Sequence, residues 1–342
     1  MKDKKFALFL ILFLFCNTLI TACSNTTAGE IEPQGIPINV TVSTVNLSNY
    51  THPSNCFKLL YPVGWEIVEH DTSVTFNAPD DSSTIEVIIV NTGYELETVS
   101  FENFINAAET NWFGTYKNYQ ETMREDNPEK GYSRRVKTLD WNKIPQNVSS
   151  IYQKKGEVVY WLNFWENQAS ISSTQSVFEQ IIESISYDPT YCADLTPYNS
   201  SMPFSGPYGL FSIQVPIQWI HTSERGDVYQ IDTFFSPDSK AVIQNITHDD
   251  GKTVTRGTAD IIALDYLKEI YAKDVFISEA RVQSDNSIRW IWKSLSGGFQ
   301  GTTFYETRGT TFLMLTIMYI NDQKEVYFPP LDFAISSYTI PQ

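Results

Sequence analysis

The sequence predicts an α+β fold made of two repeated domains, each an antiparallel β-sheet flanked by helices in a sandwich. The motif F-x4-P-x2-W occurs twice, at 57–65 and 211–219, with its first residues 154 positions apart. Segments with the patterns of strands and helices follow both copies in the same order. Spacing between matched segments changes by only a few residues, as expected where loops vary in length. A duplication explains all three observations.

After the opening strand, the first copy continues with strand-like segments at 74–81 and 83–90, and the second copy with matching segments at 232–239 and 240–246. A helix is expected next. Its apolar residues Phe101, Phe104, Ile105, Ala108 and Trp112 lie at the i, i+3, i+4, i+7 spacing of one helical face. The segment 259–272 is its less regular counterpart.

A hairpin and a final helix complete each copy. The hairpins at 151–165 and 304–318 align with Gly156 and Gly309 at their turns, where glycine readily adopts a positive φ. The final helices are expected in 176–186 and 326–337. Because Pro329 and Pro330 interrupt the second of these, that helix is expected to start later and to be shorter.

The predicted organisation has five parts, which are a signal peptide at 1–22, a tether at 23–55, a first repeat at 56–188, a linker at 189–207 and a second repeat at 208–342. The linker is rich in proline, and the tether contains no lysine or arginine. Neither composition favours a regular helix or a central strand. Alternating apolar residues in 36–42 would allow part of the tether to pair as an edge strand.

The motif Y-P-x-G-W, the helix that follows it, the glycine-turn hairpin and the final F-x2-I-x3-I helix together resemble the PsbP fold. That fold belongs to the extrinsic subunit of photosystem II, to an import factor that binds the GTPase Ran, and to small secreted bacterial lipoproteins. The second copy departs from the pattern, with Val215 in place of the aromatic residue and Gln218 in place of the glycine. The resemblance implies a tandem protein-contact fold without catalysis, but fold alone does not supply function.

The first 22 residues have the layout of a secretory signal peptide. Lys2, Lys4 and Lys5 precede the apolar stretch 6–15, which is too short to span a membrane comfortably. The residues before Cys23 resemble a bacterial lipobox, in which cleavage precedes a cysteine that carries lipid. We therefore expect a lipoprotein anchored through Cys23 to the cell membrane or the outer membrane, facing outside the cytoplasm. An ordinary signal peptide with an unmodified Cys23 is the alternative.

The chain is strongly acidic, with a formal net charge of −16 at pH 7. Nucleic-acid binding requires clustered lysine and arginine to displace counterions from phosphates, so this class of partner is excluded. The expected partners are the membrane, through the lipid, and a protein or other ligand of the cell envelope that the sequence does not identify.

Two cysteines, Cys56 and Cys192, remain in the expected mature chain, at the two ends of the first repeat. In an oxidising compartment such a pair commonly forms a disulfide bond. Two free thiols are the alternative. A metal site formed by this pair alone would lack the further ligands that zinc requires.

The sequence contains no motif for catalysis, for a cofactor or for a metal. It has four histidines without metal-ligand spacing, and no G-x-S-x-G, Walker or G-x-G-x-x-G motif. We therefore expect a non-enzymatic binding or assembly protein without cofactor or metal. A cell-envelope hydrolase with an acidic site where the two repeats meet is the first alternative.

Tryptophans supply a second alternative, a glycan-binding module. Trp161 and Trp165 share one face of their strand, and Trp290 and Trp292 share one face of another. Exposed indole rings can stack on sugars or anchor a partner protein. In a sheet covered by helices on both sides, however, such rings are expected in the core, and only exposed rings would support the glycan hypothesis.

Overall fold

The computed structural model describes residues 45–168 and 171–341, and within 171–175 it describes the backbone alone. These residues belong to one compact unit. The expected signal peptide, the lipid-bearing Cys23 and the alternating segment 36–42 lie outside the described residues. In the described part of the chain, no helix is both long enough and apolar enough to cross a membrane.

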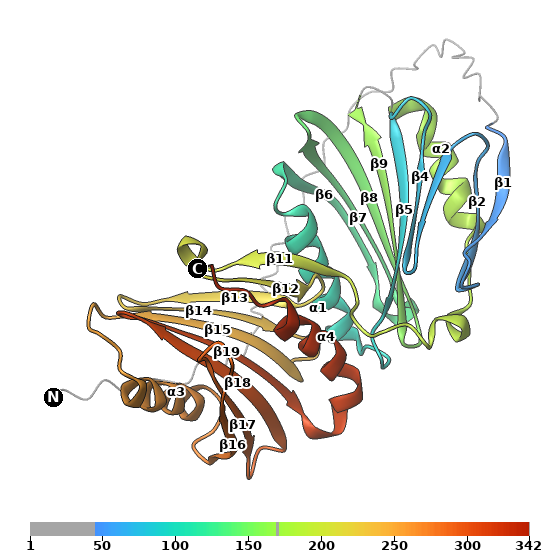
Figure 1. Cartoon of the computed structure of the whole chain (residues 1–342). Helices are drawn as coiled ribbons and strands as arrows, with labels where there is room; N and C mark the ends of the chain where they lie inside the picture. Colours follow the sequence, from blue (N-terminus) through green and yellow to red (C-terminus); the bar gives the residue numbers. More distant parts are fainter. Residues whose placement is uncertain (1–44, 169–170, 342) are drawn as a thin grey trace, which may run out of the picture. The chain divides into compact units, whose positions relative to one another are not determined.

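The first repeat contains ten strands and two α-helices within the described residues (Figure 1). The strands are β1 (Leu47–Thr51), β2 (Phe57–Pro62), β3 (Glu66–His70), β4 (Ser73–Asn77), β5 (Ser83–Asn91), β6 (Lys117–Asn127), β7 (Tyr132–Trp141), β8 (Ile144–Lys155), β9 (Val158–Asn167) and β10 (Ser186–Tyr187). The helices are α1 (Thr98–Ala108), which continues into one turn of π-helix (Glu109–Phe113), and α2 (Ile171–Ser184). The second repeat follows the connecting residues 188–200.

The second repeat contains nine strands and two α-helices within the described residues (Figure 1). The strands are β11 (Ser201–Ser205), β12 (Ser212–Pro216), β13 (Ile220–Arg225), β14 (Tyr229–Phe235), β15 (Ala241–Asp249), β16 (Val275–Val282), β17 (Ile288–Ser294), β18 (Phe299–Arg308) and β19 (Thr311–Ile320). The helices are α3 (Arg256–Ile270) and α4 (Lys324–Ser337). Pro329 and Pro330 lie inside α4.

Each repeat has one seven-stranded antiparallel sheet, and the two sheets have the same strand order. The order is β3-β4-β5-β9-β8-β7-β6 in the first and β13-β14-β15-β19-β18-β17-β16 in the second. The hairpin turns match as well, since Gly156 and Gly309 have φ of 59° and 64°. The predicted α+β fold with two repeated, sheet-based domains is confirmed.

Helices cover both faces of each sheet. In the first repeat, α1 packs on one face through the predicted apolar stripe, in which Phe101, Phe104, Ile105 and Ala108 are all buried. The other face packs against α2 and the small sheet β1-β2-β10. In the second repeat, α3 covers one face, while α4 and β12 cover the other. Successive side chains of every central strand therefore enter two different cores.

Several details differ from the sequence-based expectation. Strand β1 lies within the predicted tether and strand β11 within the predicted linker, so each repeat begins earlier than expected. The opening strands β2 and β12 lie outside the seven-stranded sheets, pairing instead with β1 and β10, and with β11. The final helix of the second repeat does not start late, because α4 begins at Lys324 and extends through both prolines. Burial of Tyr327, Pro330 and Leu331 against the sheet outweighs the hydrogen bonds that the prolines remove.

Polar side chains of α1 and its π-helical turn bind backbone of the second repeat. Asn111 Nδ2 donates to the carbonyl oxygens of Ile217 and Trp219 at 2.7 and 2.8 Å. Asn103 Nδ2 donates to the carbonyl oxygen of Pro237 at 2.9 Å. Each bond satisfies a backbone carbonyl group in a turn. In a regular sheet, the amide of a neighbouring strand would satisfy such a group.

Candidate functional site

A row of polar side chains crosses the face of the first sheet that α1 covers. Lys137 of β7 donates from Nζ to Ser150 Oγ of β8 at 2.8 Å. Ser150 in turn donates to Asn163 Oδ1 of β9 at 2.6 Å. Asn163 Nδ2 donates to Glu86 Oε2 of β5 at 2.9 Å. These four residues, from Lys137 to Glu86, are named the polar row, and they link an ammonium group to a carboxylate across four strands.

The ammonium end of the polar row forms a buried ion pair with the π-helical turn. Lys137 Nζ lies 2.5 Å from both carboxylate oxygens of Glu109, and the two side chains are 0% and 6% exposed. Tyr152 donates its hydroxyl to the same carboxylate at 2.8 Å. The ring of Phe113 lies below the ammonium, with its centroid 3.5 Å from Nζ. The widened turn places Glu109 over the sheet, and such turns often occur at functional sites.

Burial shifts the protonation equilibria of this cluster. Burial lowers the pKa of Lys137 to about 8, although the Glu109 charge opposes the shift. Burial and the Glu109 charge raise the pKa of Tyr152, so its hydroxyl stays protonated and acts as a donor to Glu109. A lysine pKa below its usual range means that the ion pair does not fully offset the cost of removing the ammonium from water.

The carboxylate end of the polar row opens into a cavity of about 250 Å³. Four aromatic rings line this cavity together with Glu86, and they belong to Trp112, Tyr116, Trp141 and Trp165. We call the cavity the aromatic pocket. Trp165 is its central ring. Tyr116 and Trp141 lie 5.8 and 6.3 Å from Trp165 between centroids, tilted by 69° and 51°. The rings thus stand at angles to one another instead of closing into a stack.

Glu86 is a partly exposed carboxylate without a cationic neighbour. Its hydrogen-bond partner is Asn163, and in the described part of the chain it takes part in no ion pair. Burial raises its pKa, and the bond from Asn163 only partly reverses this effect. The neutral lining residues Thr75, Asn77 and Thr84 complete the polar side of the pocket. The site therefore combines aromatic faces with one carboxylate that the fold leaves without a counter-charge.

The second repeat has a neutral counterpart of the polar row. Strand pairing places Gln244 opposite Thr316, as Glu86 lies opposite Asn163. It likewise makes Thr303 the counterpart of Ser150. At the far end, Trp292 occupies the position of Lys137.

Two of the three hydrogen bonds in the first row have counterparts in the second. Trp292 Nε1 donates to Thr303 Oγ1 at 2.9 Å, and Thr303 lies 2.9 Å from Thr316 in turn. The last link differs, because Gln244 donates to Thr233 at 3.1 Å and accepts a bond from Tyr271 at 3.2 Å, whereas Glu86 accepts from Asn163. The same fold therefore forms this row without any charge, so the ionic residues of the first repeat are not a requirement of the architecture.

The exchange of Lys137 for Trp292 is accommodated by the residue on the neighbouring strand. Val148 lies opposite Lys137, whereas Gly301 lies opposite Trp292. A Cβ atom on Gly301 would lie 2.5 Å from both the Trp292 ring and the carbonyl oxygen of Ile317. The large indole is thus possible only because its neighbour has no side chain.

Gly301→Ala is expected to lower the free energy of unfolding by about 1–3 kcal/mol, because both the ring and the strand backbone would have to shift. Thermal unfolding of the variant measures the effect. Gly298→Ala, at a position with open space around the added Cβ but a φ of +67°, is the comparison for backbone strain alone. Equal stability of Gly301→Ala and the wild type would contradict the proposed crowding.

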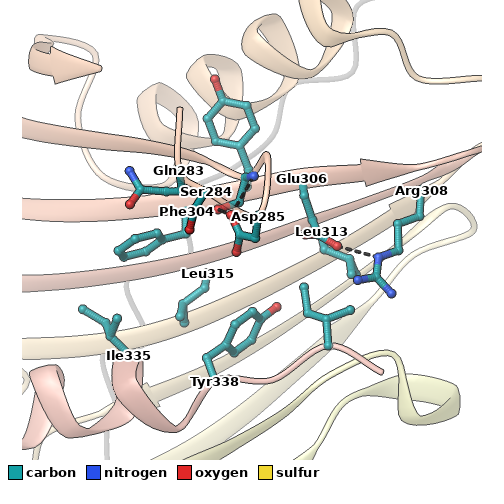
Figure 2. Close-up of a pocket in the computed structure, with 13 residues that line it drawn as sticks. Gln283, Ser284, Asp285, Phe304, Glu306, Arg308, Leu313, Leu315, Ile335 and Tyr338 are labelled. Atoms are coloured by element: carbon teal, nitrogen blue, oxygen red, sulfur yellow. Dashed lines mark hydrogen bonds and ion pairs between the residues drawn. The ribbon is translucent and has the colours of Figure 1, made fainter. Parts of the chain in front are cut away.

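A larger cavity, of about 570 Å³, lies in the second repeat between the sheet, the β16–β17 turn and the end of α4. Figure 2 shows turn residues 283–285 and the α4-side residues Ile335 and Tyr338 on opposite sides of it. Its charged groups already have partners, and Asp285 accepts bonds from the amide and hydroxyl of Ser287. Arg308 pairs with Glu306 at 2.6 Å and donates to the carbonyl oxygen of Pro341. Each charged group of this cavity is therefore already engaged by a neighbouring group of the protein.

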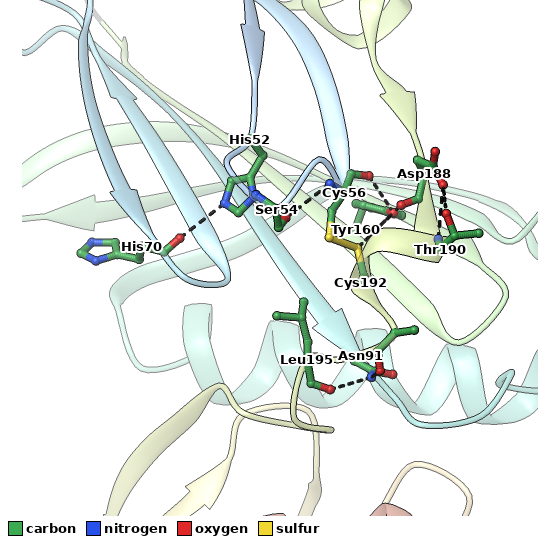
Figure 3. The surroundings of a disulfide bond; sticks show 11 residues. His52, Ser54, Cys56, His70, Asn91, Tyr160, Asp188, Thr190, Cys192 and Leu195 are labelled. Carbon is green, nitrogen blue, oxygen red and sulfur yellow. Dashed lines mark hydrogen bonds between the residues drawn. A yellow bond between two sulfur atoms is a disulfide. The ribbon is translucent and has the colours of Figure 1, made fainter.

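The structure joins Cys56 and Cys192 in a disulfide bond at the ends of the first repeat (Figure 3). Both residues are fully buried. Tyr160 donates its hydroxyl to the carbonyl oxygen of Cys56 at 3.0 Å, and the amide of Asp188 donates to the same oxygen at 2.8 Å. The bridge connects the start of β2 with the residues that follow β10.

Of the four tryptophans considered for binding, the structure places only Trp165 at the aromatic pocket. Trp161 and Trp292 are 0% exposed, and Trp290 is 8% exposed. The possibility that these three rings form a binding platform is wrong, because helices cover both sheet faces and fill the space with aromatic side chains. Among the described residues, no group of three or more histidine, cysteine, aspartate or glutamate side chains could hold a metal ion.

Sequence reasoning missed most of the site, namely Glu86, Glu109, Lys137 and the pocket rings other than Trp165. These residues come from separate elements, and their meeting depends on a strand order that local patterns do not predict. One signal was present. Lys137 alternates with Arg135 and Leu139 on the buried side of β7, where an apolar residue is expected. Alignment of the two copies would also have paired this lysine with a tryptophan.

No protein-family model matches the chain, and no curated protein matches it in sequence. Several solved structures are similar to parts of it. Cyanobacterial PsbP (CyanoP) from Synechocystis sp. PCC 6803 matches with a TM-score of 0.32 and 13% identity, over 47% of this chain and 98% of that protein. A Pseudomonas aeruginosa protein of unknown function, PA94, matches with a TM-score of 0.31 and 9% identity, over 42% and 98%.

The type VI secretion immunity protein TplEi of Pseudomonas aeruginosa covers more of the chain. It matches over 81% of this chain and 98% of its own length, with a TM-score of 0.22 and 10% identity. The likeness to PsbP is therefore distant and concerns the fold alone. None of these similarities assigns a function to this chain.

Proposed function

We propose that this chain is a bacterial lipoprotein, anchored by Cys23 outside the cytoplasm, that binds a small ligand in the aromatic pocket of its first repeat without catalysing a reaction. The observation that carries the proposal is Glu86, a carboxylate without a counter-charge in a pocket that four aromatic rings line. A concave, mostly aromatic site with few polar groups is typical of ligand binding. Its volume lies below the range usual for drug-sized ligands, so it favours a small molecule or the head group of a larger one.

Binding is favoured over hydrolysis by the groups that line the pocket. Among the described lining residues, Glu86 is the one carboxylate, and the other titratable group is the phenol of Tyr116. Burial and the charge of Glu86 raise the pKa of Tyr116, so the phenol remains protonated and is not a base. A glycosidase of the usual kind needs two carboxyl groups flanking the scissile bond. The pocket offers one.

Ligand-observed saturation-transfer NMR on the full chain tests the binding function. The panel contains choline, 3,3-dimethylbutanol, N-acetylglucosamine and acetate, which represent a cation, its neutral isostere, a neutral sugar and an anion. At least one is expected to receive saturation from the wild type and to lose it in Trp165→Met, which introduces the residue found at the matched position 318 of the second repeat. Tyr208→Ala, which removes a ring that is 90% exposed in the second repeat, is the control. Absence of transfer to all four compounds would contradict the proposal.

Anchoring is tested separately, by expression of the full chain in bacteria with a clickable palmitate analogue. Wild-type protein is expected to carry the label and to sediment with membranes, because several acyl chains hold one residue firmly at a bilayer. Cys23→Ala is expected to lose the label and to leave the membrane fraction, whereas Cys16→Ala is expected to keep both. Label that persists in Cys23→Ala would show that the lipid is attached to another residue.

A further inference from the structure

We infer that the ligand of the aromatic pocket is a small organic cation whose ammonium group bears methyl groups, such as choline or a lipid or polymer head group of that chemistry. This inference rests on the proposed binding function and specifies its ligand. It follows from the electrostatics of the pocket, from its geometry and from the comparison between the two repeats.

Charge complementarity is the first argument. The ammonium at the far end of the polar row is neutralised by Glu109 at 2.5 Å, and two neutral side chains separate it from Glu86. Glu86 therefore lacks a positive neighbour among the described side chains. Partial removal of a carboxylate from bulk water without a counter-charge has a free-energy cost, and a bound cation would reduce that cost. The net charge of −16 adds a long-range attraction for cations.

Ring geometry is the second argument. The faces of aromatic rings carry negative potential, and a cation within about 6 Å of several centroids is attracted to each of them. Tyr116 and Trp141 flank Trp165 at angles of 69° and 51°, so the rings form walls and not a flat platform. A sugar stacks best on a flat, exposed ring, whereas a round methylated ammonium contacts several inclined walls. Trp141 is 47% exposed and forms the outer wall, which leaves the pocket accessible.

The second repeat supplies the third argument. At the matched positions it has Gln244 for Glu86 and Met318 for Trp165, and thus neither the carboxylate nor the central ring. Both features that would bind a cation are absent together, while the bonds from Trp292 to Thr303 and between Thr303 and Thr316 are kept. If Glu86 had only a structural role, its presence would not be expected to depend on the presence of the central ring, Trp165. The comparison also shows that the fold tolerates Gln and Met at these positions.

Isothermal titration of the full chain with choline and with 3,3-dimethylbutanol, at constant ionic strength, tests the inference. Choline is expected to bind at least about tenfold more tightly than its neutral isostere, because only choline gains from the ring faces and the carboxylate. Glu86→Gln is expected to remove about tenfold or more of the choline affinity and to leave the affinity for the isostere unchanged. Trp165→Met is expected to weaken both. Asp71→Asn, which removes an exposed carboxylate of the same repeat, is the control for net charge.

Each outcome has a defined meaning. Equal affinity for choline and the isostere, or an unchanged choline affinity in Glu86→Gln, would overturn the cation inference while the binding function stands. Binding of N-acetylglucosamine alone would also overturn it and would favour a glycan-binding module. Absence of binding by every compound would overturn the proposed function itself. Circular dichroism of each variant establishes that a loss of binding is not a loss of fold.

Discussion

Lys137→Met is expected to lower the free energy of unfolding by about 3–5 kcal/mol, because it leaves the Glu109 carboxylate buried without its ionic partner. Both charged groups are almost fully enclosed, at 0% and 6% exposure, and lie 2.5 Å apart. The bonds from Tyr152, at 2.8 Å, and Tyr119, at 3.4 Å, to Glu109 would remain, but neutral donors do not replace an ammonium. Urea unfolding followed by circular dichroism measures the loss.

Replacement of both partners is expected to have a very different effect. The double variant Lys137→Met, Glu109→Gln should be within about 1 kcal/mol of the wild type or more stable than it, since neutral substitutes for a buried ion pair avoid its desolvation cost. The lowering of the Lys137 pKa by burial indicates that this cost is not fully recovered in the native protein. The coupling energy of the double-mutant cycle then measures the interaction free energy between Lys137 and Glu109.

An exposed ion pair of the same repeat is the matched control. Arg124 and Glu121 lie 2.9 Å apart with side chains 45% and 27% exposed, so Arg124→Met is expected to cost less than about 1 kcal/mol. A single Lys137→Met variant as stable as the wild type would contradict the burial of the pair. A double variant as unstable as the single one would contradict the desolvation argument. In the expected case, the charges are retained at some cost in stability, which is common at functional sites.

The parts of the fold that could be predicted from sequence are those fixed by local spacing. The α1 stripe from Phe101 to Ala108 depends on a 3.6-residue period, and the hairpin turns depend on the positive φ of Gly156 and Gly309. The duplication did not help to identify either element, but it established the order in which the elements occur in both repeats. The separate small sheets could not be foreseen, because β2 pairs with β10, which is distant in the chain, as well as with the nearby β1.

The candidate site was less predictable for the same reason. Trp165 was recognised as an aromatic residue on a strand face, but its neighbours Tyr116, Trp141 and Glu86 come from a loop and two other strands. Sequence alternation says which face a side chain occupies, and it does not say which strand lies beside it. Helix α4 shows that a local signal can also mislead. Pro329 predicts an interruption of the helix, but burial of the helix against the sheet outweighs this local effect.

Removal of the disulfide bond is expected to produce the second large effect. Cys56→Ala, Cys192→Ala should lower the free energy of unfolding by about 4–5 kcal/mol on the chain-entropy model, because the bridge closes a long loop of the unfolded chain. The two residues are 136 positions apart. Native contacts at the junction, such as the bonds that the Cys56 carbonyl accepts from Tyr160 and Asp188, do not require the sulfur atoms and should persist. Urea unfolding of the wild type with and without dithiothreitol measures the same quantity, and the reductant should not affect the variant.

The second repeat makes the equivalent closure without a covalent bond. Ser212 of β12 and Thr339 after α4 exchange two backbone hydrogen bonds, at 2.8 and 2.9 Å, where Lys58 and Ser186 pair in the first repeat. That repeat contains no cysteine. Hydrogen exchange of β2 is therefore expected to be slower than that of β12 in the oxidised protein and to approach it after reduction, since the bridge opposes local opening of the first repeat alone. Equal exchange of β2 before and after reduction, together with two titratable thiols in the native protein, would show that the bridge does not form and that the first repeat is closed by packing, as the second one is.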